Sequence, residues 1–160
     1  MSGPDCLLCT GARADEELGR TMVWEDLLWR LSMARRGYTT GFGYLEPKRH
    51  IPHITDLDGE EAATFGIVLG RATRALKEAA GAELVWVYVF GGGIAHLHVH
   101  LAPHRAGDAL NSNIIRGELT MEPHPSGASR MVSRDFAERS ADEIAAVAER
   151  ARELLSSAES

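Results

Sequence analysis

Long apolar runs, an excess of basic charge and a secretory leader are all missing from this sequence of 160 residues. No apolar run approaches the roughly 20 residues that a membrane-spanning helix needs. The first residues carry neither the basic nor the apolar region of a signal peptide. Acidic side chains outnumber basic ones by 23 to 17, which disfavours non-specific binding to nucleic acid. We therefore expect a cytoplasmic protein whose partners are neither membranes nor nucleic acids.

Cysteine is also scarce, since Cys6 and Cys9 are the only two in the chain. Without a secretory context a structural disulfide is not expected. A thioredoxin-like redox pair should follow a strand, and no strand pattern precedes Cys6. Metal binding is therefore the favoured use of the pair, and it requires two further ligands.

The composition, with 44% hydrophobic and 25% charged residues, fits one globular domain over residues 1–160. We expect its core at about residues 6–103. Residues 104–139 contain several Pro, Gly and Ser and little periodicity, which predicts a loop-rich extension. A capping box at 140–143 predicts a C-terminal helix over 140–156.

Local periodicity predicts the elements of the core. Two short apolar runs over 21–33 predict a hairpin, and residues 41–46 predict a third strand. Apolar residues at spacings of three and four predict a long helix over 59–80. The β-branched and aromatic run at 83–90 predicts a buried strand, paired tightly and antiparallel with the next strand across three glycines.

That next strand is expected to carry three histidines on one face. His96, His98 and His100 alternate with apolar residues, and residues two apart in a strand point the same way. Near neutral pH each imidazole is a possible hydrogen-bonding group, nucleophile or metal ligand. The pattern therefore predicts a reactive or metal-binding surface.

The same residues resemble a known family. The segment HLHVHLA at 96–102 is similar to the histidine triad (HIT) motif, and GFGYLEPKRH at 41–50 resembles the strand of that family that ends in Pro-Lys-x-His. The pair Cys6 and Cys9 resembles that of zinc-bearing bacterial members and, more distantly, galactose-1-phosphate uridylyltransferase. The resemblance covers about residues 6–103. It implies an α+β fold, in which an antiparallel sheet of about five strands carries one long packed helix, and a homodimer.

The resemblance also implies covalent catalysis on a phosphorus atom bonded to a nucleotide. His98 would be the nucleophile, and His100 would bind the phosphate or the leaving group. A neutral imidazole can form a nucleotidyl-histidine, which splits one difficult displacement into two easier ones. Backbone N–H groups of Gly91, Gly92 and Gly93 would approach the phosphate. The substrate would be a small nucleotide-linked molecule, such as a nucleotide phosphoramidate, a dinucleoside polyphosphate or an adenylated compound.

For the metal, the zinc-bearing members imply a structural Zn²⁺ held by Cys6, Cys9, His50 and His96. Two thiolates and two imidazoles form a closed tetrahedral site. His53, three residues after His50, is an alternative fourth ligand.

The chain departs from the family at the nucleotide-binding positions. The acidic residue that usually holds the ribose is replaced by Ala34, and the Gln and Ser or Thr before the triad are replaced by the glycines. The long extension offers possible substitutes, namely Arg105, Asn111, Asn113 and Arg116.

Two other functions therefore stay open. The three histidines of the triad could hold a catalytic metal, as in metal-dependent hydrolases and lyases. Alternatively, the domain could be a non-enzymatic ligand-binding module on a degenerate scaffold.

Overall fold

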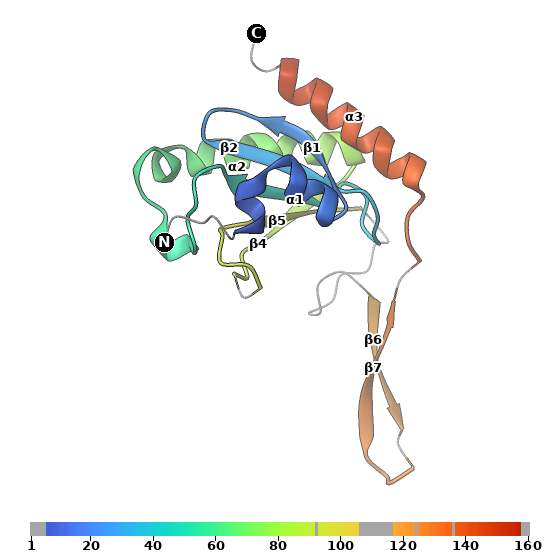
Figure 1. Cartoon of the computed structure of the whole chain (residues 1–160). Coiled ribbons are helices and arrows are strands. Elements are labelled where there is room, and N and C mark those ends of the chain that lie inside the picture. Colours follow the sequence, from blue (N-terminus) through green and yellow to red (C-terminus); the bar gives the residue numbers. More distant parts are fainter. Residues whose placement is uncertain (1–5, 92, 106–116, 124, 136, 158–160) are drawn as a thin grey trace.

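A five-stranded antiparallel sheet in the order β1-β2-β3-β5-β4 forms the centre of the structure (Figure 1). The structure is a computed structural model that describes residues 6–91, 93–105, 117–123, 125–135 and 137–157. The strands of this sheet are β1 (Arg20–Glu25), β2 (Trp29–Ala34), β3 (Gly43–Pro47), β4 (Leu84–Tyr88) and β5 (Val99–His104). The helices are α1 (Ala12–Glu17), α2 (Gly59–Ala80) and α3 (Ala141–Ser157), with short 3₁₀ turns η1 (Leu7–Thr10) and η2 (Ile54–Asp56).

The long helix α2 covers one face of the sheet, and the core lies between them. Its buried stripe includes Val68, Ala72 and Leu76, and the sheet contributes fully buried side chains such as Leu45 and Leu101. The helix approaches β3 closely at Gly43, where a Cβ would lie 2.8 Å from the Cδ1 atom of Leu76. Helix α3 packs beside α2 and against β1. Among the described helices, none combines the length and apolarity that a membrane crossing requires.

The α+β fold class and the hairpin, the third strand and both long helices are confirmed. Helix α2 has the predicted bounds of 59–80 and ends at Gly81 in the left-handed conformation. Asp58 occupies the N-cap position, but its carboxylate pairs with Arg49 instead of capping the helix. At the start of α3, the Ser140 hydroxyl accepts a hydrogen bond from the Glu143 N–H, as the capping box predicts.

Two predictions about the last strands are wrong. Strand β4 is not buried, because it pairs only with β5 and lies at the edge of the sheet, with Trp86 46% and Val87 43% exposed. The turn between β4 and β5 is not tight, because β5 begins at Val99 and residues 89–98 form the connection. His100 therefore lies in β5, whereas His96 and His98 precede it.

The extension after β5 contains a second sheet where loops were predicted. Strands β6 (Gly117–Pro123) and β7 (Ser129–Asp135) form an antiparallel ribbon that projects away from the body (Figure 1). Asn111, Asn113 and Arg116, suggested as phosphate-binding substitutes, lie outside the described residues, as does Gly92.

Candidate functional site

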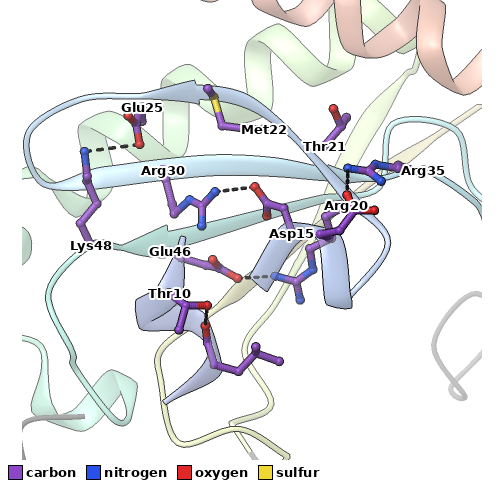
Figure 2. A network of polar contacts seen from close by, with 12 residues as sticks. Thr10, Asp15, Arg20, Thr21, Met22, Glu25, Arg30, Arg35, Glu46 and Lys48 are labelled. Carbon is purple, nitrogen blue, oxygen red and sulfur yellow. Dashed lines mark hydrogen bonds and ion pairs between the residues drawn. The ribbon is translucent and has the colours of Figure 1, made fainter. Parts of the chain in front are cut away.

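The site lies on the face of the sheet opposite α2. Register places Ser32, Tyr44 and His100 side by side on this face, whereas their chain neighbours Leu31, Leu45 and Leu101 enter the core. We call this surface the polar face. The N-terminal helix α1 lies over part of it and contributes Asp15 (Figure 2).

Two buried ion pairs occupy the polar face. Arg20 Nη1 lies 2.5 Å from Glu46 Oε1, and Arg30 Nη2 lies 2.5 Å from Asp15 Oδ2. All four residues are at most 6% exposed. The Arg20 guanidinium also stacks on the ring of Tyr44, 3.6 Å from its centroid. Because a buried charge is costly unless it is paired, these contacts hold α1 and three strands in one arrangement.

Sequence analysis missed these four residues. The signal that might have found them is alternation, because Arg30 and Glu46 each stand between apolar residues in strands that were correctly predicted. Charged residues at such positions indicate a polar inner face rather than a solvated one.

The imidazole of His98 is fixed by the backbone two residues before it. Its Nδ1 atom lies 2.6 Å from the carbonyl oxygen of His96. Because a carbonyl oxygen only accepts, Nδ1 carries the proton and donates it. When the ring is neutral, its lone pair is therefore on Nε2, which is the arrangement that a nucleophilic histidine requires.

The imidazole of His100 lies beside that of His98, with ring centroids 5.1 Å apart. Aromatic rings surround it at centroid distances of 5.4–5.8 Å, contributed by Phe42, Tyr44 and Phe90. Both ring nitrogens are buried without a hydrogen-bond partner among the described residues. Burial, with smaller contributions from His98 and Arg20, lowers the pKa of His100 to about 4. His100 is therefore neutral at physiological pH.

The imidazole of His96 belongs to a different cluster, together with Cys6, Cys9 and His50. One ligand atom from each of these four side chains lies within 4.8 Å of all the others. In the described part of the chain, this is the only group of three or more such side chains close enough to hold a metal. The three triad histidines therefore do not converge on one point, and His53 lies outside the cluster.

The distances in this cluster fit a tetrahedral metal site. The Nδ1 atom of His96 lies 3.4 Å from both sulfur atoms, and the Nδ1 atom of His50 lies 3.4 Å from the Cys9 sulfur. A tetrahedron with bonds of about 2.0–2.3 Å to zinc has edges of about 3.3–3.8 Å. The Nε2 atom of His96 donates to the Pro47 carbonyl at 2.9 Å, which leaves the Nδ1 lone pair directed at the cluster.

The electrostatics of the cluster favour a bound cation. Burial and the neighbouring Cys6 raise the pKa of Cys9 to about 11, so its thiol is protonated in the absence of a positive charge. Burial likewise lowers the pKa of His96, which keeps that imidazole neutral. A metal ion would convert the thiols to thiolates and use neutral imidazoles as they stand.

The remaining predicted residues are placed as follows. Gly91 has a φ of 68°, a conformation that favours glycine, and lies near His53. Gly93 lies in the same connection before the triad. Ala34 ends β2 next to Arg20 of β1. Arg105 pairs with Glu143 of α3 at 3.0 Å.

Comparison with known proteins identifies similar chains. No family model matches this sequence. An uncharacterised HIT-like protein of Mycobacterium tuberculosis is 26% identical over 142 residues, which cover 85% of this chain and 96% of that protein. The nitrilase and fragile histidine triad fusion protein NitFhit of Caenorhabditis elegans is 28% identical over 92 residues, or 54% of this chain. The match spans only 21% of that longer protein.

Solved structures share the fold over nearly the whole chain. A zinc-bound histidine triad family protein from Mycobacterium smegmatis superimposes with a TM-score of 0.64 at 22% identity, over 97% of this chain and 96% of that one. A hypothetical histidine triad nucleotide-binding protein from Sulfolobus tokodaii gives 0.67 at 19% identity, over 96% and 94%. In sequence and in fold, the chain is similar to proteins of the histidine triad superfamily. The M. smegmatis protein is zinc-bound, and the Cys₂His₂ cluster of this chain suggests a zinc site.

The low pKa of His100 predicts a loss of stability in acid. The unfolded chain binds a proton at His100 near pH 6.5, whereas the folded protein does so only near pH 4. The contribution of His100 to the free energy of unfolding is therefore complete above about pH 6.5. It decreases by about 1–2 kcal/mol as the pH falls to 4, after allowance for partial solvent screening. Chemical denaturation between pH 4 and 8, compared with that of His100→Asn, measures the difference.

The His100→Asn variant is expected to lack this part of the pH dependence of the free energy of unfolding. An imidazole NMR titration of His100 near pH 6.5 would contradict the expectation.

Proposed function

We propose that this histidine triad protein hydrolyses or transfers a nucleotidyl group through a covalent intermediate on His98. The observation that supports this most is the hydrogen bond from His98 Nδ1 to the His96 carbonyl, which in the neutral ring places the lone pair on Nε2. Its substrate is a small nucleotide-linked molecule in the cytoplasm, of the phosphoramidate, dinucleoside polyphosphate or adenylated class. The nucleotide-binding description of the S. tokodaii relative agrees with this class.

The residues of the polar face suit the two steps of such a reaction. His98 Nε2 attacks the phosphorus, and the bond to the leaving group breaks with its electron pair. His100, a neutral neighbour on the same side, donates a hydrogen bond to the phosphate or leaving group. Backbone N–H groups at Gly91 and Gly93 approach the phosphate without interference from a Cβ. Water or another acceptor then displaces the nucleotide and returns the electron pair to Nε2.

His98→Ala tests the mechanism. Loss of the nucleophile should lower the turnover of radiolabelled diadenosine tetraphosphate by about three orders of magnitude or more. It should also abolish labelling of the protein during turnover. His104→Ala, at the far end of β5, is the matched control and should retain both properties. A His98→Ala protein with near-normal turnover would refute the covalent mechanism.

We further propose that Cys6, Cys9, His50 and His96 hold a structural Zn²⁺. The donor set, the 3.4 Å separations and the His96 tautomer all fit zinc. When bound, the ion would supply cross-linking rather than acid–base chemistry, since four protein ligands leave no open position. These ligands would join the N-terminal turn to the segment after β3 and to the segment before β5.

Zinc content and thermal unfolding test this site independently of activity. The purified protein should contain about one zinc per chain, and Cys9→Ser should lose it and unfold at a lower temperature. Thr10→Ser, a change in the adjacent residue outside the cluster, should retain the ion. Metal that remained bound to Cys9→Ser in equal amount would instead favour a catalytic metal on the triad histidines.

We also propose that the protein is a homodimer that pairs through β4. This strand is the last of the sheet. Together with the two residues after it, the strand exposes 40–54% of each of five apolar side chains, namely Leu84, Trp86, Val87, Val89 and Phe90. An exposed apolar edge strand is a template for pairing with another chain. Two copies related by a twofold axis would bury the same surface on both partners.

Light scattering during gel filtration tests the dimer. The wild-type protein should have twice the 17.4 kDa mass of one chain. Val87→Lys, which places a charge in the interface, should shift the protein to the monomer. Ile67→Lys on the outer face of α2, where Ile67 is 72% exposed, should not. A wild-type monomer at micromolar concentration would refute the dimer.

A further inference from the structure

Glu46 lies next to the proposed nucleophile on the polar face. The ladder between β3 and β5 pairs Tyr44 with His100 and Leu45 with Val99. Continued by one residue, the same antiparallel register places Glu46 opposite His98. Both face away from the core that Leu45 and Val99 enter. His98 itself precedes β5, so this placement lies one residue beyond the last pair of the ladder.

The carboxylate of Glu46 is only partly used by the protein. Its Oε1 atom binds Arg20, whereas Oε2 is buried without a hydrogen-bond partner among the described residues. The residue is 1% exposed. A buried oxygen without a partner is costly. Asp15 Oδ1 is buried in the same way, so the position beside His98 is what distinguishes Glu46.

Electrostatic coupling between Glu46 and His98 supports this reading. Burial raises the pKa of Glu46, and Arg20 opposes the rise, with smaller opposing contributions from Arg30 and His98. The charged and titratable groups around Glu46 are thus Arg20 on β1, Arg30 on β2 and His98 just before β5.

The proposed reaction creates a positive charge at this point. The nucleophilic form of His98 is the neutral ring, which keeps its proton on Nδ1. When Nε2 bonds to phosphorus, the leaving group departs with the electron pair of its own bond. Nδ1 keeps its proton, so the ring becomes cationic. Hydrolysis returns the pair to Nε2, and the charge disappears. A fixed carboxylate beside the ring stabilises the charged state and the transition state that leads to it.

We propose that Glu46, oriented by Arg20, is the counter-charge that stabilises the cationic nucleotidyl-His98 intermediate. This inference rests on the proposed covalent mechanism. Glu46 acts through His98 and does not touch the substrate, so it is a positioning residue. Arg20 holds the Oε1 atom and thereby fixes the direction of Oε2.

The alternative is that Glu46 and Arg20 form a purely structural ion pair. A second buried ion pair in the same chain allows the two roles to be compared. The pair of Arg30 and Asp15 is equally short and equally buried. It also lies on the polar face, but Asp15 comes from α1 and not from a strand beside β5. A structural role would make the two pairs equivalent, whereas the proposed role makes only Glu46 affect the chemistry.

The experiment measures formation and breakdown of the intermediate separately. Excess wild-type, Glu46→Gln or Asp15→Asn protein is mixed with radiolabelled diadenosine tetraphosphate. Samples are stopped in alkaline detergent, which preserves the phosphorus–nitrogen bond, and protein-bound label is counted with time. Glu46→Gln should acquire label at least about tenfold more slowly than the wild type. Its adduct, once formed, should hydrolyse at least as fast as the wild-type adduct, because the intermediate itself is destabilised. Asp15→Asn should be labelled at close to the wild-type rate.

A double variant separates chemistry from folding. Glu46→Gln leaves Arg20 as an unpaired buried charge and will lower the unfolding temperature. Glu46→Gln with Arg20→Gln removes both charges, so the unfolding temperature should recover while labelling stays slow. Zinc content is measured for every variant to verify that the metal cluster is intact.

Each outcome decides between the possibilities. Labelling restored in the double variant, or a wild-type rate in Glu46→Gln, would overturn the role of Glu46 and leave the nucleophile in place. A wild-type protein that never acquires label would overturn the covalent mechanism together with this inference.

Discussion

His96 is the residue on which the rest of the site depends, because each of its polar atoms fixes a different part of the structure. Its Nε2 atom donates to Pro47 at the end of β3, and its Nδ1 atom faces the two cysteines. Its carbonyl oxygen accepts a hydrogen bond from the Nδ1–H group of His98. The same residue therefore orients a metal-type cluster and sets the tautomer of the neighbouring imidazole. Since it is 1% exposed, water does not compete for these contacts.

The sheet divides the molecule into two chemically different halves. On the α2 side, interlocked apolar side chains supply hydrophobic stabilisation that does not depend on pH or metal. On the polar face, paired charges and neutral histidines supply an arrangement that holds only while every partner is present. This specific geometry makes the polar face sensitive to substitution, because loss of one partner leaves the other as an unpaired buried charge. A site that must hold two imidazoles in fixed orientations benefits from that rigidity.

The elements with a strong local signal could be predicted from the sequence. The 3.6-residue period gives α2 to the residue, and the Pro-Lys-x-His segment and the Cys-x-x-Cys pair correctly indicated which distant residues meet. The alternation of histidines with apolar residues at 96–100 did not indicate where hydrogen bonding to β3 begins. The start of β5 was therefore misplaced. The apolar content of 83–90 could not distinguish a core strand from an edge strand, since both exclude charge. The ion pairs were not predictable in detail, because partners 15 and 26 residues apart in the chain leave no pattern in either segment.

The error about β4 links the edge of the sheet with the site. Phe90, just beyond the end of β4, is 54% exposed and yet its ring lies 5.5 Å from the ring of His100. It also stacks on Tyr88, which pairs with His100 across the ladder. A partner that covered this edge would therefore bury the outer side of Phe90 while its inner side still shields the His100 nitrogens from water. Because burial is the main reason that His100 is neutral, whatever covers β4 also governs the protonation state of the imidazole beside the proposed nucleophile. The proposed association and the proposed chemistry would then share a single aromatic side chain, and a substitution of Phe90 would affect both.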